Sequence, residues 1–141
     1  MIDARILDAP PTDPTEIWAR FAFSVFLRLL SVVFLVLTLM VWASAVGYLD
    51  NSLTRFDTMP TQTRIYVAVL AVLNPVACVG LWATLSWGRT VWLIASAFQL
   101  GFVLTDPSVT QYPDALVAFH LSCLTIYVAM RLLLHRVANK E

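Results

Sequence analysis

Four long apolar stretches occupy more than half of the chain, and together they contain no Asp, Glu or Lys. They cover residues 29–49, 65–85, 90–104 and 115–134. A helix needs about 20 apolar residues to cross the hydrocarbon layer of a bilayer. Three stretches reach that length alone, and the remaining one, 90–104, reaches it when residues 87–89 are included. The sequence therefore predicts an all-α membrane protein, a bundle of four transmembrane helices.

The composition agrees with this class and excludes several others. Hydrophobic residues make up 60% of the 141 residues and charged residues 13%, whereas soluble domains carry about 25% charged residues. The formal net charge is zero, so no basic surface for nucleic acid is expected. We expect one membrane domain at 17–135, preceded by an extended, proline-containing cytoplasmic arm at 1–16 and followed by a cytoplasmic tail at 136–141.

The distribution of Lys and Arg predicts the orientation of the bundle. These residues favour the cytoplasmic ends of membrane spans. With the N-terminus inside, seven of the nine lie on the cytoplasmic side, and only Arg55 and Arg64 face outward. The seven are Arg5, Arg20, Arg28, Arg89, Arg131, Arg136 and Lys140. Because four spans return the chain to its starting side, we expect both termini in the cytoplasm, an N-in/C-in topology.

A group of basic and aromatic residues marks the expected inner membrane interface. Trp is enriched where a bilayer meets water, and Arg side chains extend from helix ends to the lipid headgroups. The members of this group are Arg28, Arg89, Arg131, Trp82, Trp87 and Trp92. Residues 17–28 are predicted to be an interfacial lead-in to the first span. Residues 86–89 (Ser-Trp-Gly-Arg) are predicted to be a tight inner turn that makes the second and third spans antiparallel neighbours.

Four polar side chains inside the spans are predicted to share one layer in the outer half of the membrane. His120, Gln99 and Ser44 each lie five residues from the outer end of a span, and Asn74 lies nine residues from its end. A helix rises about 1.5 Å per residue, so these groups lie at similar depths. Polar groups inside a membrane need partners. The layer is either an interhelical hydrogen-bond cluster or a small polar pocket for a quinone, a lipid head group or a partner's side chain.

The sequence gives no reason to expect a metal, a cofactor or catalysis. A haem between two histidines would need both at one depth, but His120 and His135 are 15 residues apart, which is about 22 Å along a helix. Cys78 and Cys123 lie in different spans and form no Cys-x-x-Cys pair. The chain has no Gly-rich phosphate loop, no His-Glu-x-x-His helix and no Ser or Cys beside a base. We therefore expect no enzyme activity.

Pro75 lies in the middle of the second span and predicts a kink there. Proline removes one backbone donor and leaves the carbonyl of Ala71, four residues earlier, without its helical partner. Asn74 or Gln99 is the expected donor to that carbonyl. A broken helix at mid-membrane also occurs at transport sites. A transporter is nevertheless disfavoured, because no other span has a matching break and no span contains a carboxylate.

Two stripes of small residues follow helical spacing in the spans. The fourth span carries Ala118, Ser122, Thr125 and Ala129, and the second carries Ala77, Gly80 and Ala83. Small residues allow helix backbones to approach closely. Either stripe can serve packing within the bundle, and one of them can instead bind a partner subunit.

Several short motifs support a family resemblance. They are Arg28-Leu29-Leu30-Ser31-Val32-Val33, Trp42, Phe56-Asp57, Val76-Ala77, Gly80-Leu81-Trp82, Trp87-Gly88, Val91-Trp92-Leu93 and Phe119-His120. With them the chain resembles, over most of residues 20–135, an uncharacterised family of small four-helix inner-membrane proteins from alphaproteobacteria. It is more loosely similar to DoxX-like four-helix proteins. The resemblance implies a multi-pass protein of the bacterial inner (plasma) membrane and implies no activity.

The leading functional hypothesis is a non-catalytic accessory or assembly subunit of a larger inner-membrane complex. It rests on the short loops, the small-residue stripes and the lack of catalytic motifs. The expected partners are the lipid bilayer and either a protein partner or a second copy of the chain, bound through helix faces. The alternative is a binder of a quinone, lipid or other small amphiphile in the polar layer near His120. A small transporter ranks third.

Overall fold

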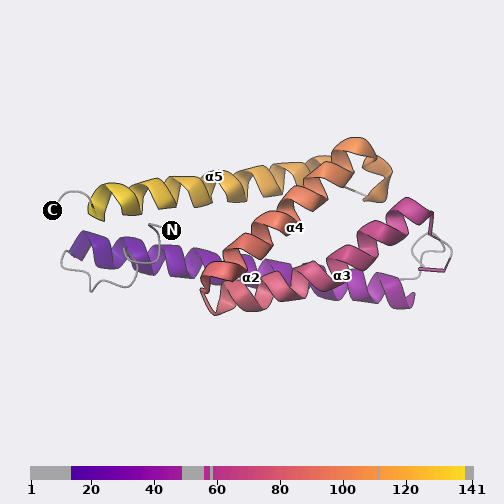
Figure 1. Cartoon of the computed structure of the whole chain (residues 1–141), viewed down its shortest axis with the longest axis horizontal. Coiled ribbons are helices and arrows are strands. Elements are labelled where there is room, and N and C mark those ends of the chain that lie inside the picture. The colour runs from indigo at the N-terminus through magenta and orange to yellow at the C-terminus, as the bar shows by residue number, and fades with distance from the viewer. Residues whose placement is uncertain (1–13, 49–55, 58, 111, 139–141) are drawn as a thin grey trace.

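The computed structural model describes residues 14–48, 56–57, 59–110 and 112–138, and almost all of this part is helical (Figure 1). The helices are α2 (Pro14–Val46), α3 (Thr61–Trp82), α4 (Ser86–Thr105) and α5 (Pro113–Ala138), with a short 3-10 helix η1 (Pro107–Val109) before α5. Each of the four α-helices is long and apolar enough to cross a membrane by length and composition. The prediction of four apolar helices is confirmed, and α4 includes residues 87–89, which the apolar stretch 90–104 needed to reach the length of a span.

Helix α2 is one continuous helix of 33 residues that joins the expected lead-in to the first span. It begins at Pro14, where proline's fixed φ and missing N–H are tolerated, so residues 14–16 of the expected arm are helical. The rest of that arm, and tail residues 139–141, lie outside the described residues. The helix ends at Val46, and Gly47 after it has a φ of 78°, the left-handed conformation that commonly follows a helix C-terminus. The amide of Tyr48 donates to the carbonyl of Ala43 at 2.9 Å and satisfies the last turn.

Helices α3 and α4 form a hairpin whose turn lies earlier than the sequence predicts. The turn is made by residues 83–85, and Thr84 adopts the left-handed conformation with a φ of 55°. The amides of Thr84 and Leu85 donate to the carbonyls of Leu81 and Gly80, both at 3.0 Å. This is the Schellman pattern, in a position that glycine usually occupies. Residues 86–89, predicted to be the turn, are instead the first turn of α4.

Gly88 is needed for the close approach of α3 and α4. A glycine is favoured both in a tight turn and at a close helix contact, and Gly88 serves the second. A Cβ atom on Gly88 would lie 2.2 Å from the carbonyl carbon of Gly80, and a Cβ on Gly80 would lie 2.4 Å from the Cα of Gly88. Only two glycines permit this backbone contact between α3 and α4. Two members of the small-residue stripe of the second span, Ala77 and Gly80, are therefore buried inside the bundle, whereas the third, Ala83, is exposed in the turn.

Helix α2 packs against both α3 and α5, and more extensively against α3. Helix α5 runs beside α2, and the α3–α4 hairpin covers only part of their length, so the start of α2 and the end of α5 lie together beyond the hairpin turn (Figure 1). α2 buries one stripe at helical spacing, Phe23, Leu27, Leu30 and Phe34, in a core shared with the other three helices. A second apolar cluster lies at the opposite end, around Tyr66, Leu70 and Val103.

Large apolar side chains cover the outside of the bundle. Leu29, Leu39, Val72, Ile94 and Leu104 are among many that are about half exposed or more. Soluble monomers rarely display continuous apolar surface of this extent. The arrangement is that expected of a multi-pass membrane protein, in which lipid tails cover these side chains.

Candidate functional site

Asn74 and Gln99 form the one link of the predicted polar layer that the described residues show directly. Asn74 lies in α3 and is 1% exposed, and Gln99 lies in α4 and is 2% exposed. The Nε2 of Gln99 donates to the Oδ1 of Asn74 at 3.4 Å, which is long for a hydrogen bond. The expectation that Gln99 is buried in protein is confirmed. This bond crosses the helix pair that the two glycines hold together.

His120 is also buried, but it does not bond to that pair. Its residue is 1% exposed on α5, and its Nδ1 lies 2.9 Å from the carbonyl oxygen of Leu116, one turn back on the same helix. A carbonyl oxygen only accepts, so Nδ1 carries the proton, and in the neutral ring Nε2 is a bare acceptor. Within the described structure that Nε2 is buried and has no hydrogen-bond partner.

The surroundings of the His120 ring are aromatic. The centroid of the Phe119 ring lies 5.2 Å from the centroid of the His120 ring, and that of Phe34 on α2 lies 6.5 Å from it. Both pairs are T-shaped. The histidine thus joins α5 to α2, whereas Asn74 and Gln99 join α3 to α4. Ser44, the fourth predicted member, is half-buried near the end of α2. The structure therefore joins Asn74 to Gln99 and places His120 in a separate, aromatic environment.

Three buried hydroxyl side chains, those of Ser31, Thr38 and Ser96, belong to the bundle interior and were not identified from the sequence. Ser96 is 1% exposed and lies one turn before Gln99 on α4; its Oγ has no partner among the described residues. Thr38 of α2 is 7% exposed, and its hydroxyl donates to the carbonyl of Phe34 at 2.7 Å. The spacing of Ser96 and Gln99 by three residues was the available signal. Such a signal is weak, because Ser and Thr in helices commonly bond their own backbone.

The three tryptophans of the expected inner belt divide into two kinds. Trp82 and Trp87 are 58% and 45% exposed, as side chains at a lipid interface would be. Trp92 is 1% exposed, and its ring packs edge-on against Tyr127 of α5 with centroids 5.3 Å apart. Its Nε1 is buried without a partner in the part of the chain that the structure describes. Trp92 is therefore a core residue between α4 and α5 rather than a lipid-facing one.

The arginines of the same group also differ in their surroundings. Arg28 is exposed on α2, Arg89 is only 9% exposed in the first turn of α4, and Arg131 is half-buried on α5. Near the start of α2, Arg20 pairs with Glu16 at 2.6 Å across one helical turn. Such a pair stabilises a helix by a few tenths of a kcal/mol.

The carbonyl that Pro75 leaves free is satisfied by a residue the sequence did not suggest. Trp42 of α2 donates its Nε1–H to the carbonyl oxygen of Ala71 at 3.2 Å. The expectation that Asn74 or Gln99 would supply this donor is wrong: the described donor is Trp42, and the amide of Gln99 donates to Asn74 instead. An indole on the neighbouring helix thus satisfies the carbonyl at the proline in α3, which continues as one helix from Thr61 to Trp82.

The described residues contain no group of three or more His, Cys, Asp and Glu that could hold a metal ion. Cys78 and Cys123 are both free thiols. The polar chemistry described inside the bundle therefore consists of the Asn74–Gln99 bond between α3 and α4, side-chain bonds from α2 to backbone carbonyls of α3, and separate buried polar atoms on α4 and α5.

A family model matches residues 21–138, which is most of the chain and all four of its described α-helices in large part. The chain belongs to DUF6163, a family of unknown function. No curated protein and no solved structure matches it. The prediction of an uncharacterised family is confirmed, and DUF6163 membership by itself assigns no activity.

Proposed function

We propose that this DUF6163 protein is a non-catalytic subunit of a larger complex in the bacterial inner membrane, and that α5 binds a transmembrane helix of a partner subunit. The observation that carries the proposal is the exposure of α5. In the most apolar 18-residue segment of α5 only 11% of the residues are buried, whereas 39% are buried in the corresponding segments of α3 and of α4. A helix that packs so little within its own bundle has surface available for another helix.

The chemistry of the exposed face of α5 supports this role. Ala118, Ser122, Thr125 and Ala129 are all exposed. At about 100° per residue they point in one direction, opposite to the buried residues His120, Cys123 and Leu134. The stripe of small residues therefore faces away from the bundle, where packing within the chain does not require it.

The stripe also has the shape and polarity that helix packing needs. A shallow groove of about 410 Å³ lies beside its C-terminal half; Thr125 and Ala129 of the stripe line it together with Leu124, Val128 and Leu132. The hydroxyls of Ser122 and Thr125 donate to the carbonyls of Ala118 and Leu121 on their own helix, at 2.7 and 2.8 Å. With these donors satisfied, a partner helix can approach closely at little polar cost.

Site-specific cross-linking tests the proposal. A photo-reactive benzoylphenylalanine at Thr125 should cross-link in native membranes to a second protein, and the product should be lost when Ser122 and Ala129 are both changed to Leu. The control position is Leu39, which is 61% exposed on α2 and should give no such product.

Two outcomes would overturn the proposal. A product composed of two copies of this chain would make the α5 face a homodimer interface. Equal products from Thr125 and Leu39, or a Thr125 product unaffected by the leucine substitutions, would show that the stripe is not a binding face.

We propose in addition that both termini are cytoplasmic, which the excess of Lys and Arg on one side supports. In a chain without native cysteines, a Ser108→Cys variant should react with a membrane-impermeant maleimide added from the periplasm, and Asn139→Cys should not. Ser108 is exposed in η1, next to the carboxylate of Asp106. The reverse labelling pattern would invert the topology.

A further inference from the structure

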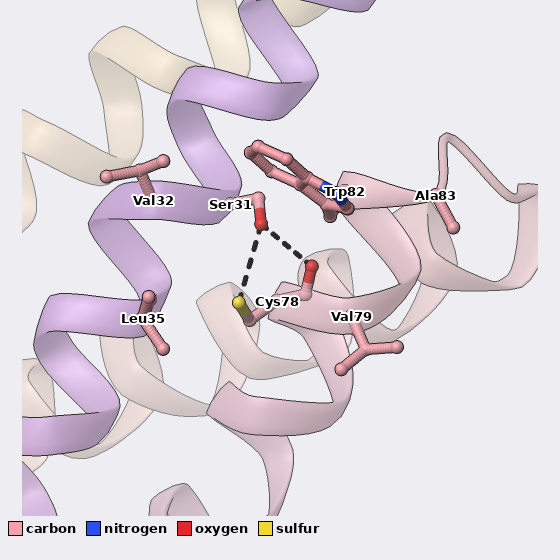
Figure 2. A pocket seen from close by; sticks show the side chains of 7 residues that line it. All are labelled: Ser31, Val32, Leu35, Cys78, Val79, Trp82 and Ala83. Atoms are coloured by element: carbon pink, nitrogen blue, oxygen red, sulfur yellow. Dashed lines mark hydrogen bonds between the residues drawn. The ribbon is translucent and has the colours of Figure 1, made fainter.

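A second groove lies between α2 and α3, and its walls are almost entirely apolar (Figure 2). Its volume is about 360 Å³, and it is lined by Ser31, Val32, Leu35, Cys78, Val79, Trp82 and Ala83. Ligand sites have volumes of about 300–1,000 Å³, so the groove can hold part of one hydrocarbon chain.

The hydroxyl of Ser31, which lies in the groove, already has a partner in the protein. It donates to the backbone carbonyl of Cys78 at 2.8 Å and lies 3.4 Å from the Cys78 sulfur (Figure 2). This contact joins α2 to α3 and uses the hydroxyl hydrogen of Ser31 within the bundle. The interior of the groove therefore offers an occupant mainly apolar contact, and an apolar chain fits it best.

A positive charge lies at one end of the groove. Arg28 is one turn before the groove residues of α2, and at 100° per residue it points between Ser31 and Val32, about 60° from the first and 40° from the second. Its side chain is exposed, and no residue in the described part of the chain forms a hydrogen bond or ion pair with it.

The end that Arg28 occupies is the end at the α3–α4 turn. Ser31 meets Cys78, and α2 and α3 run in opposite directions, so Arg28 is level with the last turn of α3 near Trp82. Trp82 is 58% exposed and lines the groove. A cation and an amphipathic indole at the mouth of an apolar groove match a molecule with an anionic head and an apolar tail.

We propose that Arg28 and the α2–α3 groove form a binding site for one anionic phospholipid. The guanidinium binds the lipid phosphate through paired, charge-assisted hydrogen bonds, and one acyl chain lies against Val32, Leu35 and Val79. The site requires that α2 and α3 lie in a bilayer, but it does not depend on a partner at α5.

Lipid binding to the full-length protein tests the proposal. The protein in detergent is titrated with phosphatidylglycerol or with phosphatidylcholine of identical acyl chains, and bound lipid is counted by native mass spectrometry. One arginine near a membrane surface contributes about fivefold in affinity for anionic lipid. We therefore expect about fivefold preference for phosphatidylglycerol, which Arg28→Gln abolishes and Arg28→Lys retains in part.

Matched controls separate the head-group site from the groove. Arg136→Gln removes the same charge from the exposed end of α5 and should keep the preference. Val79→Trp fills the groove and should weaken the binding of both lipids, whereas Val72→Trp, on an exposed part of α3 outside the groove, should not. Gel filtration and thermal unfolding confirm that each variant is folded.

Four results would overturn the proposal. They are equal binding of the two lipids by the unmodified protein, an unchanged preference in Arg28→Gln, displacement of phosphatidylglycerol by millimolar inorganic phosphate, and equal effects of the two tryptophan variants. Displacement by phosphate would identify a site for the anion alone. Equal lipid binding would leave the groove to a protein helix.

Discussion

The backbone contact between Gly80 and Gly88 determines how closely α3 and α4 approach, and adding a single methyl group tests it. A Cβ on Gly88 would lie 2.2 Å from the carbonyl carbon of Gly80, whereas non-bonded carbon atoms rest about 3.5–4.0 Å apart. Because the obstructing atoms are backbone, no side-chain rotation relieves the clash. The helices must separate by about 1 Å or more at this point.

The expected cost follows from two opposing effects. Overpacking a tight contact destabilises a protein by about 1–3 kcal/mol, and a backbone clash belongs in the upper part of that range. Replacing Gly by Ala within a helix stabilises it by at most about 1 kcal/mol through helix propensity. We therefore expect Gly88→Ala to lower the free energy of unfolding by about 1–2 kcal/mol.

The same helix provides a matched control. Gly101 also lies within α4, and a Cβ there would meet nothing within 4 Å. Gly101→Ala should therefore show the propensity effect alone and raise the free energy of unfolding by about 0.5–1 kcal/mol. Both values can be measured by reversible unfolding in mixed micelles. Opposite signs for one chemical change in one helix are the expected result.

A double substitution strengthens the test. Gly80→Ala and Gly88→Ala relieve the same clash by the same separation of helices, so the double variant should lose less stability than the sum of the two single losses. If Gly88→Ala instead stabilised the protein as Gly101→Ala does, the close approach of the helices would be refuted.

Three further substitutions test one strained backbone position and two hydrogen bonds by the same unfolding measurement. Thr84→Gly should raise the free energy of unfolding by about 1 kcal/mol, because a non-glycine residue in the left-handed conformation is strained; a loss would contradict the turn. Trp42→Phe should lower it by about 0.5–1.5 kcal/mol by leaving the Ala71 carbonyl without its donor, and no change would argue against that bond. His120→Leu should leave it unchanged or raise it, since the ring bonds only to a carbonyl of its own helix and its Nε2 has no described partner; a loss above about 2 kcal/mol would indicate an unseen partner.

The positions of the four helices could be predicted from the sequence because the length and purity of an apolar run are local properties. The addition of residues 87–89 to the third span followed from the bilayer thickness, and α4 contains them. The separate prediction of a tight turn at residues 86–89 was wrong. Glycine permits either a sharp turn or a close helix contact, and only the partner at Gly80 decides between them.

The direction in which a side chain points was harder to predict than its depth. Counting residues along a span placed Asn74 about one helical turn deeper than Gln99, close enough for contact, and the two side chains do bond. The same count says nothing about rotation of one helix relative to another. Trp92 therefore lies in the core instead of facing lipid, and the donor to the Ala71 carbonyl comes from Trp42 on α2. Both outcomes depend on packing between helices that are distant in sequence.

The two small-residue stripes of this chain have the same chemistry and opposite surroundings. In α3 the stripe residues Ala77 and Gly80 are buried, and Gly80 contacts the backbone of α4, whereas Ala83 is exposed in the turn that follows. In α5 the stripe is exposed along its length. Leucine or valine at those α5 positions would serve equally well against lipid tails, since lipid gives no advantage to small side chains. Small residues become advantageous when another backbone must come close, and on α5 that backbone has to come from outside the chain. This contrast is the reason for placing the partner subunit at α5 rather than at the outer faces of α2 or α3.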